Sequence, residues 1–160
     1  MNVDAPLSLY YQEIRPEWTD QNGHLSIVNF GLLFNQATDT FTEFIGITEE
    51  FRKEFRVSTF AAEIHVNYLR ELLQGDRICV KTHLLGFDAK RMHYFHEMHH
   101  QTKGYIAATH EHLSLHVDME SRRVCPMPTL IQENLASVKA AHARLPVSPL
   151  VGRVIGLKSR

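Results

Sequence analysis

The clearest pattern in the chain is a helical one between residues 30 and 45. Apolar side chains recur there every three or four positions, a spacing that places them on one face of an α-helix. Asn29 is a suitable N-cap, and Gly46 stands where a glycine commonly ends a helix. Because phenylalanine is a mediocre helix former, we expect packing to stabilise this helix. The residues of the apolar face are Phe30, Leu33, Phe34, Ala37, Phe41, Phe44 and Ile45.

Strand-like patterns occupy most of the remaining chain, beginning with a predicted strand at residues 8–14. After Phe55 the period changes from about 3.6 to 2, and apolar and polar residues alternate in four further segments. Turn residues such as Gln74-Gly75-Asp76 separate these segments, and we expect tight turns of this kind to join antiparallel neighbours. The four predicted strands cover residues 59–68, 78–84, 91–101 and 105–117, and a C-terminal amphipathic helix is predicted at about 129–145.

These elements predict an α+β fold in which a curved antiparallel sheet wraps around the single long helix. No internal repeat, low-complexity tract or linker divides the chain, so residues 1–160 are predicted to form one domain with a core at about 8–128. Such a sheet has one covered face and two open edges. The open edges favour pairing with a second copy of the chain.

Composition and charge narrow the function classes. Hydrophobic residues make up 44% and charged residues 22% of the chain, as in ordinary globular proteins. Seventeen Lys and Arg residues against eighteen Asp and Glu residues give a net charge of −1, so no nucleic-acid partner is expected. The sequence has no signal-peptide pattern and no apolar run long enough for a membrane helix, and its two cysteines suit a reducing compartment. We therefore expect a cytoplasmic protein with no membrane partner.

Eleven histidines raise the question of a metal site, which would need three or four converging ligands. Four lie in the predicted strand 91–101, where alternate residues face opposite ways, so they divide between two faces. Three lie on one face of the predicted strand 105–117 but spread over more than about 10 Å. Cross-strand pairs between the groups can still meet, yet polar ladder or interface histidines are favoured and no metal is predicted. The two groups are His93, His96, His99 and His100, and His110, His112 and His116.

The segment before the long helix carries the candidate catalytic residues. Asp20, Asn22 and His24 crowd a loop that runs into a helix N-terminus. Unpaired N–H groups at such a terminus can hold a developing oxyanion, a carboxylate can attack a carbonyl or activate water, and an imidazole can transfer a proton near neutral pH. These are the parts that acyl transfer to water requires. Asp and Asn also commonly stabilise turns, so a purely structural role is the alternative.

Three stretches resemble the hotdog-fold acyl-CoA thioesterases, in the hydroxybenzoyl-CoA thioesterase-like branch. The first reads RPEWTDQNGHLSIVNFGLLFNQATD, and its Asp-x-Asn-x-His run, residues 20–24, also resembles a motif of acyl-ACP thioesterases. The others read AEIHVNYLRELLQGDRICVKTHLLGFDAKRMHYFHEM and AATHEHLSLHVD, and they are similar to small thioesterases and to domains associated with carnitine and betaine breakdown. The resemblance covers about residues 8–128 and implies the hotdog fold.

By position, the resemblance implies that Asp20 is the nucleophile or the general base. Asn22 would hold the thioester carbonyl or the water, and His24 would bind or position the substrate. No carboxylate lies in the first two helical turns, where another branch of the fold carries a catalytic Glu, and this favours Asp20. Backbone N–H groups at the helix start would form the oxyanion hole, near Ile27, Val28 and Asn29.

The resemblance also implies that coenzyme A is part of the substrate and that no separate cofactor is needed. Because coenzyme A carries phosphates, basic residues at strand ends or turns are candidates for contacting it, namely Arg70, Lys90 and Arg91. Glu63 lies on the more polar face of its strand and can approach the site. A ladder or interface role is the more common one for such a residue.

The predicted function is hydrolysis of a small or medium acyl-CoA, in a homodimer or homotetramer because sites of this fold form between subunits. The sequence does not determine which acyl group the substrate carries. Resemblance to carnitine-pathway domains suggests a betainyl group, whose trimethylammonium cation would favour an aromatic cage from Trp18, Tyr68 or Tyr94. The alternative function is a catalytically idle hotdog domain that binds acyl-CoA as a sensor or scaffold.

Overall fold

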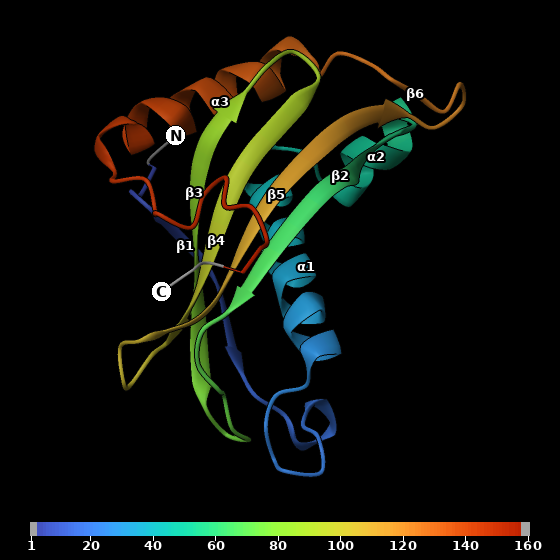
Figure 1. The fold of residues 1–160 in the computed structure, drawn as a ribbon. Helices are drawn as coiled ribbons and strands as arrows, with labels where there is room; N and C mark the ends of the chain where they lie inside the picture. Colours follow the sequence, from blue (N-terminus) through green and yellow to red (C-terminus); the bar gives the residue numbers. More distant parts are fainter. Residues whose placement is uncertain (1–2, 158–160) are drawn as a thin grey trace.

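A computed structural model describes residues 3–157, in which an antiparallel sheet curves around a long helix (Figure 1). The predicted α+β class, the curved sheet and the helix inside it are confirmed. The strands are β1 (Leu7–Glu13), β2 (Val57–Tyr68), β3 (Arg77–Phe87), β4 (Arg91–His100), β5 (Ile106–Asp118) and the short β6 (Arg123–Val124). The helices are α1 (Ile27–Phe44), α2 (Glu49–Phe55) and α3 (Thr129–Ala141), with 3-10 turns at Pro16–Trp18 and His142–Arg144.

The strands lie in the order β1-β3-β4-β5-β2, and β6 pairs with β5. Each neighbouring pair is antiparallel. β2 therefore pairs with β5, and the expectation that β2 and β3 are neighbours was wrong. Residues 69–76 do not form a tight hairpin but cross the lower end of the sheet in Figure 1 to reach the other side. Leu72, in the middle of this crossing, is buried in the core, so the connection closes the core at that end.

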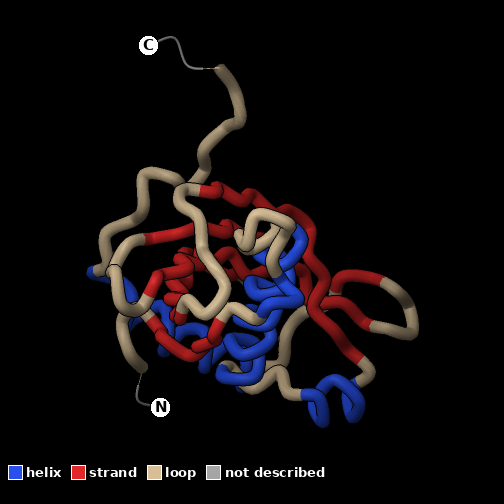
Figure 2. Tube along the Cα trace, turned by 90° about the horizontal axis from the view of Figure 1, so that it is seen from below, coloured by secondary structure: helices blue, strands red, loops and turns tan. Residues whose placement is uncertain are grey.

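α1 lies against the concave face of the sheet, as the view along the sheet shows (Figure 2). Its apolar face is the one that the sequence predicts, with Leu33, Phe34 and Phe41 fully buried. α3 packs at the other end of the core, where Ile131 and Leu135 join the same cluster as Phe41. Burial of these side chains at about 1.5–3 kcal/mol each stabilises a helix whose residues have modest intrinsic propensity.

The two ends of α1 differ in how well the sequence predicts them. The helix begins at Ile27 with Ser26 as its N-cap, so the assignment of Asn29 as N-cap was wrong. The Asn29 side-chain amide instead donates to the Trp18 carbonyl (2.9 Å) and to Ser26 Oγ (2.9 Å), which ties the first helical turn to the preceding loop. At the other end Gly46 follows the C-cap with a φ of +99°, a conformation that favours glycine.

Two helical features depart from the predicted pattern. α2 was not predicted because its seven residues, EEFRKEF, are rich in charge and none of them is buried. Its start is stabilised by Thr48, whose side chain accepts the Phe51 N–H (3.2 Å). The C-terminal helix ends at Ala141, and a 3-10 turn continues it to Arg144. Within residues 3–157, no helix combines the length and the hydropathy needed to cross a membrane.

After the last 3-10 turn the chain crosses the convex face of the sheet from β3 towards β2 (Figure 1). Residues 145–150 line a cavity of ≈ 530 Å³ together with Lys81 and Phe95. Residues 152–155 line a second cavity of ≈ 620 Å³ together with Glu63 and Glu111. The Gly152 N–H donates to the Glu111 carboxylate (2.8 Å), which fixes the segment on this face.

Four histidines form a buried stripe on the helix-facing side of β4 and β5: His96, His110, His112 and His116. The cross-strand pair that the spacing left open does form, because His96 lies opposite His110 with ring centroids 5.7 Å apart. The His96 ring nitrogens contact the hydroxyls of Thr38 (3.1 Å) and Thr82 (2.9 Å). In the part of the chain that the structure describes, no three His, Cys, Asp or Glu side chains are placed to hold a metal ion.

Burial keeps these imidazoles neutral. It lowers the pKa of His110 to about 3 and that of His112 to about 4, and it lowers the pKa of His96 well below the usual value. Both ring nitrogens of His112 and Nδ1 of His110 are buried without a hydrogen-bond partner among residues 3–157. A proton added to either ring would place a charge in a site that offers no compensating acceptor.

The histidine stripe predicts a pH-dependent stability. Because each folded-state pKa lies below the unfolded value of about 6.5, the free energy of unfolding is at its full value above about pH 6.5 and falls as the pH drops towards 4. Each buried histidine contributes up to about 1.4 kcal/mol per pH unit to this slope. Denaturant unfolding at pH 7.5, 6 and 5 measures the slope. His112→Phe should reduce the slope of the free energy of unfolding against pH by the contribution of one histidine. An unchanged slope in that variant would contradict the conclusion that His112 is buried and neutral.

Candidate active site

An open groove of ≈ 380 Å³ lies where the N-terminus of α1 meets the end of β2 and the start of the connection to β3. Two segments far apart in the sequence form its walls, one before and within α1 and one after β2. Its lining residues are His24, Leu25, Ile27, Phe30, Tyr68, Leu69, Arg70 and Glu71. Of the predicted site residues, the structure thus brings His24, Ile27 and Arg70 together.

Asp20 organises the loop that forms one wall. Its Oδ1 accepts the backbone N–H groups of Asn22 (2.8 Å) and His24 (3.1 Å), while its own N–H donates to the His24 carbonyl (2.8 Å). Gly23, with a φ of +77°, closes this tight loop. The hydrogen bonds from His24 and Asn22 lower the pKa of the exposed Asp20 carboxyl below its usual value. Asp20 is therefore ionised at neutral pH, and it stabilises a turn as the structural alternative expects.

His24 is held between the two walls. Its Nε2 lies 3.3 Å from the Glu71 carboxylate, and its backbone forms an antiparallel bridge with Leu73. Glu71 was not among the residues predicted for the site. No local pattern connects it to His24, since the two residues meet only through the crossing of residues 69–76 beneath the sheet. The Asn22 side chain lies exposed on the same turn.

The start of α1 offers free hydrogen-bond donors beside the groove. The Asn29 and Phe30 N–H groups both donate to the Ser26 carbonyl (3.0 Å each). Among the described residues, the N–H groups of Ile27 and Val28 have no such acceptor, as is usual for a first helical turn. Together with the positive end of the helix dipole, these two groups can stabilise negative charge on an oxygen atom. Asn29, the third residue predicted for the oxyanion hole, does not offer a free donor, because its N–H already donates to the Ser26 carbonyl.

Other predicted site residues lie elsewhere in the chain. Glu63 lines the cavity on the convex face together with the C-terminal segment. Lys90 and Arg91 lie at the β3–β4 turn, at the opposite end of the sheet from the Asp20 loop (Figure 1). Asp88 accepts both of their backbone N–H groups (2.8 Å each) and pairs with the Arg91 guanidinium (2.6 Å). Glu63, Lys90 and Arg91 are therefore not part of the groove in this structure.

The three aromatic residues suggested for a cage do not converge. Tyr68 lines the groove, with its ring edge-on to Phe30 at 5.3 Å. Trp18 is buried under the Arg15 guanidinium, which lies 4.9 Å from the Trp18 ring centroid. Tyr94 is fully buried beneath α1 beside the histidine stripe. Trp18, Tyr68 and Tyr94 therefore do not form a cage in this structure.

Comparison with known proteins shows the family of the chain. Residues 14–135 match the thioesterase-like superfamily. A betainyl-CoA thioesterase of Pseudomonas aeruginosa is 38% identical to this chain, over 94% of this chain and 95% of that protein. A Rhizobium meliloti protein named L-carnitine dehydrogenase/betainyl-CoA thioesterase is 29% identical over 99% of this chain, but the match spans only 32% of that longer protein.

The fold is also that of a Staphylococcus aureus protein solved in complex with CoA. The TM-score is 0.90 at 23% sequence identity, and the match covers 99% of this chain and 100% of the other. The superfamily match spans more than half of the chain, and the P. aeruginosa relative is covered almost end to end. This chain belongs to the thioesterase-like superfamily of hotdog-fold proteins.

Proposed function

We propose that this chain is an acyl-CoA thioesterase that hydrolyses betainyl-CoA. The observation that carries the proposal is the ionised Asp20 carboxylate, whose loop also presents His24 to the groove beside the free N–H groups of Ile27 and Val28. The 38% identity to a betainyl-CoA thioesterase supports the acyl group. Two free cysteines and a CoA substrate support a cytoplasmic location.

In this mechanism the thioester carbonyl oxygen accepts hydrogen bonds from the first turn of α1, which stabilise the negative charge that develops there. Asp20 either attacks the carbonyl carbon, giving an anhydride that water then hydrolyses, or removes a proton from the attacking water. In both routes the C–S bond breaks, the acyl group gains the oxygen of water and the departing sulfur gains a proton. We assign the transfer of that proton to His24, which lines the groove and pairs with Glu71.

The first prediction concerns Asp20. Asp20→Asn keeps an oxygen that can accept the Asn22 and His24 N–H groups, but it removes the carboxylate. We expect kcat to fall by about 10²-fold or more, the size typical of an acid–base group, with little change in stability. Thiol release from a panel of acyl-CoAs measures the effect.

Asp118→Asn is the matched control for Asp20. Asp118 also caps a turn, by accepting the Ser121 N–H (2.6 Å), but it lies at the far end of β5 from the groove. This variant should keep wild-type activity. Equal activity in wild type and Asp20→Asn would exclude catalysis by Asp20, and no hydrolysis of any thioester by wild type would favour the idle acyl-CoA-binding domain.

The groove suits a small cationic acyl group. Its lining includes the aromatic side chains of Phe30 and Tyr68 and, from the connection after β2, Glu71. A trimethylammonium group is attracted both to aromatic rings and to carboxylates, and each cation–π contact contributes about 0.5–2 kcal/mol. A neutral group of the same shape gains neither attraction.

The second prediction compares betainyl-CoA with 3,3-dimethylbutyryl-CoA, in which carbon replaces the charged nitrogen. We expect kcat/KM to be about tenfold higher or more for the cationic substrate, as one cation–π contact can supply that factor. Tyr68→Leu should reduce the ratio, whereas Tyr11→Leu, on the opposite edge strand, should leave it unchanged. Equal rates for the two substrates would contradict a betainyl-specific site.

We further propose that the enzyme is a homodimer in which two β2 strands pair antiparallel. β2 is a twelve-residue edge strand that exposes Phe60, Ile64 and Tyr68 by 40%, 50% and 48%. Long exposed edges with apolar side chains favour pairing. Antiparallel pairing about a two-fold axis puts the Lys90–Arg91 end of one subunit at the same end of the dimer as the Asp20 loop of its partner. This arrangement would let both basic residues reach the phosphates of CoA.

The third prediction tests this edge. Ile64→Asp places two carboxylates, one from each copy, near the two-fold axis, and their repulsion should separate the copies. We therefore expect the particle mass to fall from that of a dimer to that of a single chain, 18.5 kDa. Sedimentation equilibrium measures the change. Tyr11→Asp, at an exposed position on β1, is the control and should remain dimeric. A wild-type monomer, or a dimer that Ile64→Asp leaves intact, would exclude pairing through β2.

A further inference from the structure

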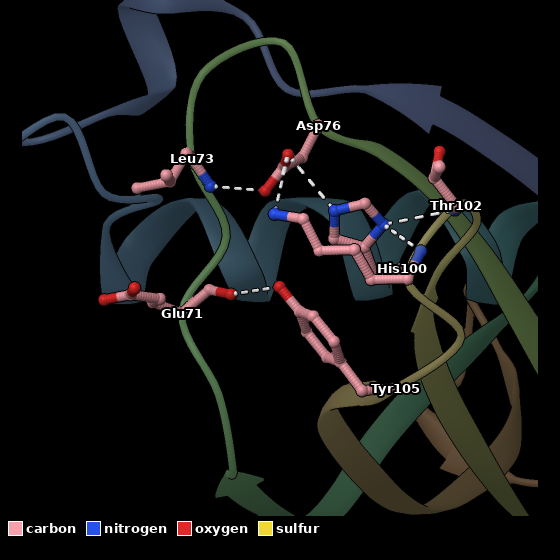
Figure 3. Close-up of polar contacts among 7 residues, drawn as sticks. Glu71, Leu73, Asp76, His100, Thr102 and Tyr105 are labelled. Carbon is pink, nitrogen blue, oxygen red and sulfur yellow. Dashed lines mark hydrogen bonds and ion pairs between the residues drawn. The ribbon is translucent and has the colours of Figure 1, made fainter.

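A network of polar contacts around Asp76 stabilises residues 69–76, the connection between β2 and β3 (Figure 3). One carboxylate oxygen of Asp76 accepts the Leu73 N–H at 2.9 Å. The other lies 3.1 Å from Nε2 of His100 and 3.8 Å from Nζ of Lys103. The Asp76 side chain is only 16% exposed, so this carboxylate is a largely buried anchor for the connection.

His100 is oriented to face Asp76. Its ring is buried, and Nδ1 accepts the backbone N–H groups of Thr102 (3.2 Å) and Lys103 (3.3 Å). Because Nδ1 acts as an acceptor, the ring carries its hydrogen on Nε2, which lies 3.1 Å from the Asp76 carboxylate (Figure 3). Tyr105 packs against the His100 ring at 5.0 Å, and its hydroxyl donates to the Glu71 carbonyl (2.9 Å). The β4–β5 turn thus holds the connection at Glu71 and at Asp76.

The segment held in this way is the one that contacts the Asp20 loop. The Leu72 carbonyl accepts the Leu25 N–H (2.8 Å), and Leu73 forms a backbone bridge with His24. The Glu71 carboxylate lies 3.3 Å from the His24 ring. The His24 N–H in turn donates to Asp20. Three successive residues of the connection therefore contact the loop that carries Asp20, and the polar network fixes both ends of that three-residue segment.

We propose that Asp76, oriented by His100, is a positioning residue that holds residues 71–73 against the Asp20 loop and so preorganises His24 and Asp20. The role in catalysis rests on the proposed thioesterase function, whereas the effect on the loop does not. Asp76 does not line the groove, so it acts through Glu71, Leu72 and Leu73.

The substitution Asp76→Asn separates this role from simple space filling. An asparagine has the size of the aspartate but only one acceptor oxygen. That oxygen can face either the Leu73 N–H or the side chains of His100 and Lys103, but not both. The NH2 group of the asparagine must then face the remaining donors, with which it cannot form a hydrogen bond. Tyr105→Phe is a second, milder variant that removes only the hydroxyl bond to the Glu71 carbonyl. Asp118→Asn again serves as the matched control, as a turn-capping carboxylate remote from the groove.

Hydrogen exchange at the backbone amides of Asn22, His24 and Leu25 is the direct test. We expect exchange there to be about tenfold faster in Asp76→Asn, the effect of losing one hydrogen bond to a charged group, and to rise less in Tyr105→Phe. Asp118→Asn should leave these amides unchanged. With the best acyl-CoA, kcat should fall by about tenfold in Asp76→Asn at a temperature at which every variant is fully folded.

The two readouts keep the two proposals distinct. Unchanged exchange at these three amides in Asp76→Asn and in Tyr105→Phe overturns the positioning role, whatever the activity. Faster exchange with unchanged kcat also overturns it, because the loop would then not need the anchor. A wild-type protein that hydrolyses no acyl-CoA refutes the proposed function, and the exchange data alone then decide whether Asp76 holds the loop.

Discussion

The contact between α1 and the concave face of the sheet forms the centre of the hydrophobic core and fixes where both ends of the helix lie. Phe34 and Phe41 are fully buried in it, and the strands curve so that the helix lies inside the sheet. Burial on this scale outweighs the modest helix propensity of the sequence. It also sets where the N-terminus of α1 lies. The Asn29 side chain donates a hydrogen bond to the Trp18 carbonyl, which fixes the loop before the helix to the start of α1. The position of the candidate site therefore depends on how α1 packs in the core.

This core is unusual because its sheet side carries imidazoles where apolar side chains would be expected. The rings take part in packing as flat aromatic groups: Phe34 stacks on His110 at 4.9 Å, and Tyr94 stacks on His112 at 4.8 Å. Several ring nitrogens have no partner among the described residues, which costs free energy. Protonation of the imidazoles therefore weakens the contact between helix and sheet, and the stability of the fold is linked to their protonation.

The candidate site is assembled from two loops rather than built on one element. Neither the Asp20 loop nor the connection at residues 69–76 has a regular partner strand of its own. Each supplies the other with backbone contacts, at Leu25 and Leu72 and at His24 and Leu73. Loops joined in this way can be rigid without belonging to the sheet, and rigidity of this kind is what a catalytic carboxylate needs if it is to be held ready beside a helix N-terminus.

The long helix, the strand segments and the loop of Asp20, Asn22 and His24 could all be predicted from the amino-acid sequence. Each of these is a local pattern, since periodicity reports which side of a segment is buried and short spacing keeps residues together. Three features emerge only when the chain is folded. β2 pairs with β5, Glu71 lies next to His24, and the groove does not include Glu63, Lys90 and Arg91 of the same chain. A pattern of burial does not say what covers the buried face. That choice depends on how all segments together bury the most apolar surface and satisfy their polar groups.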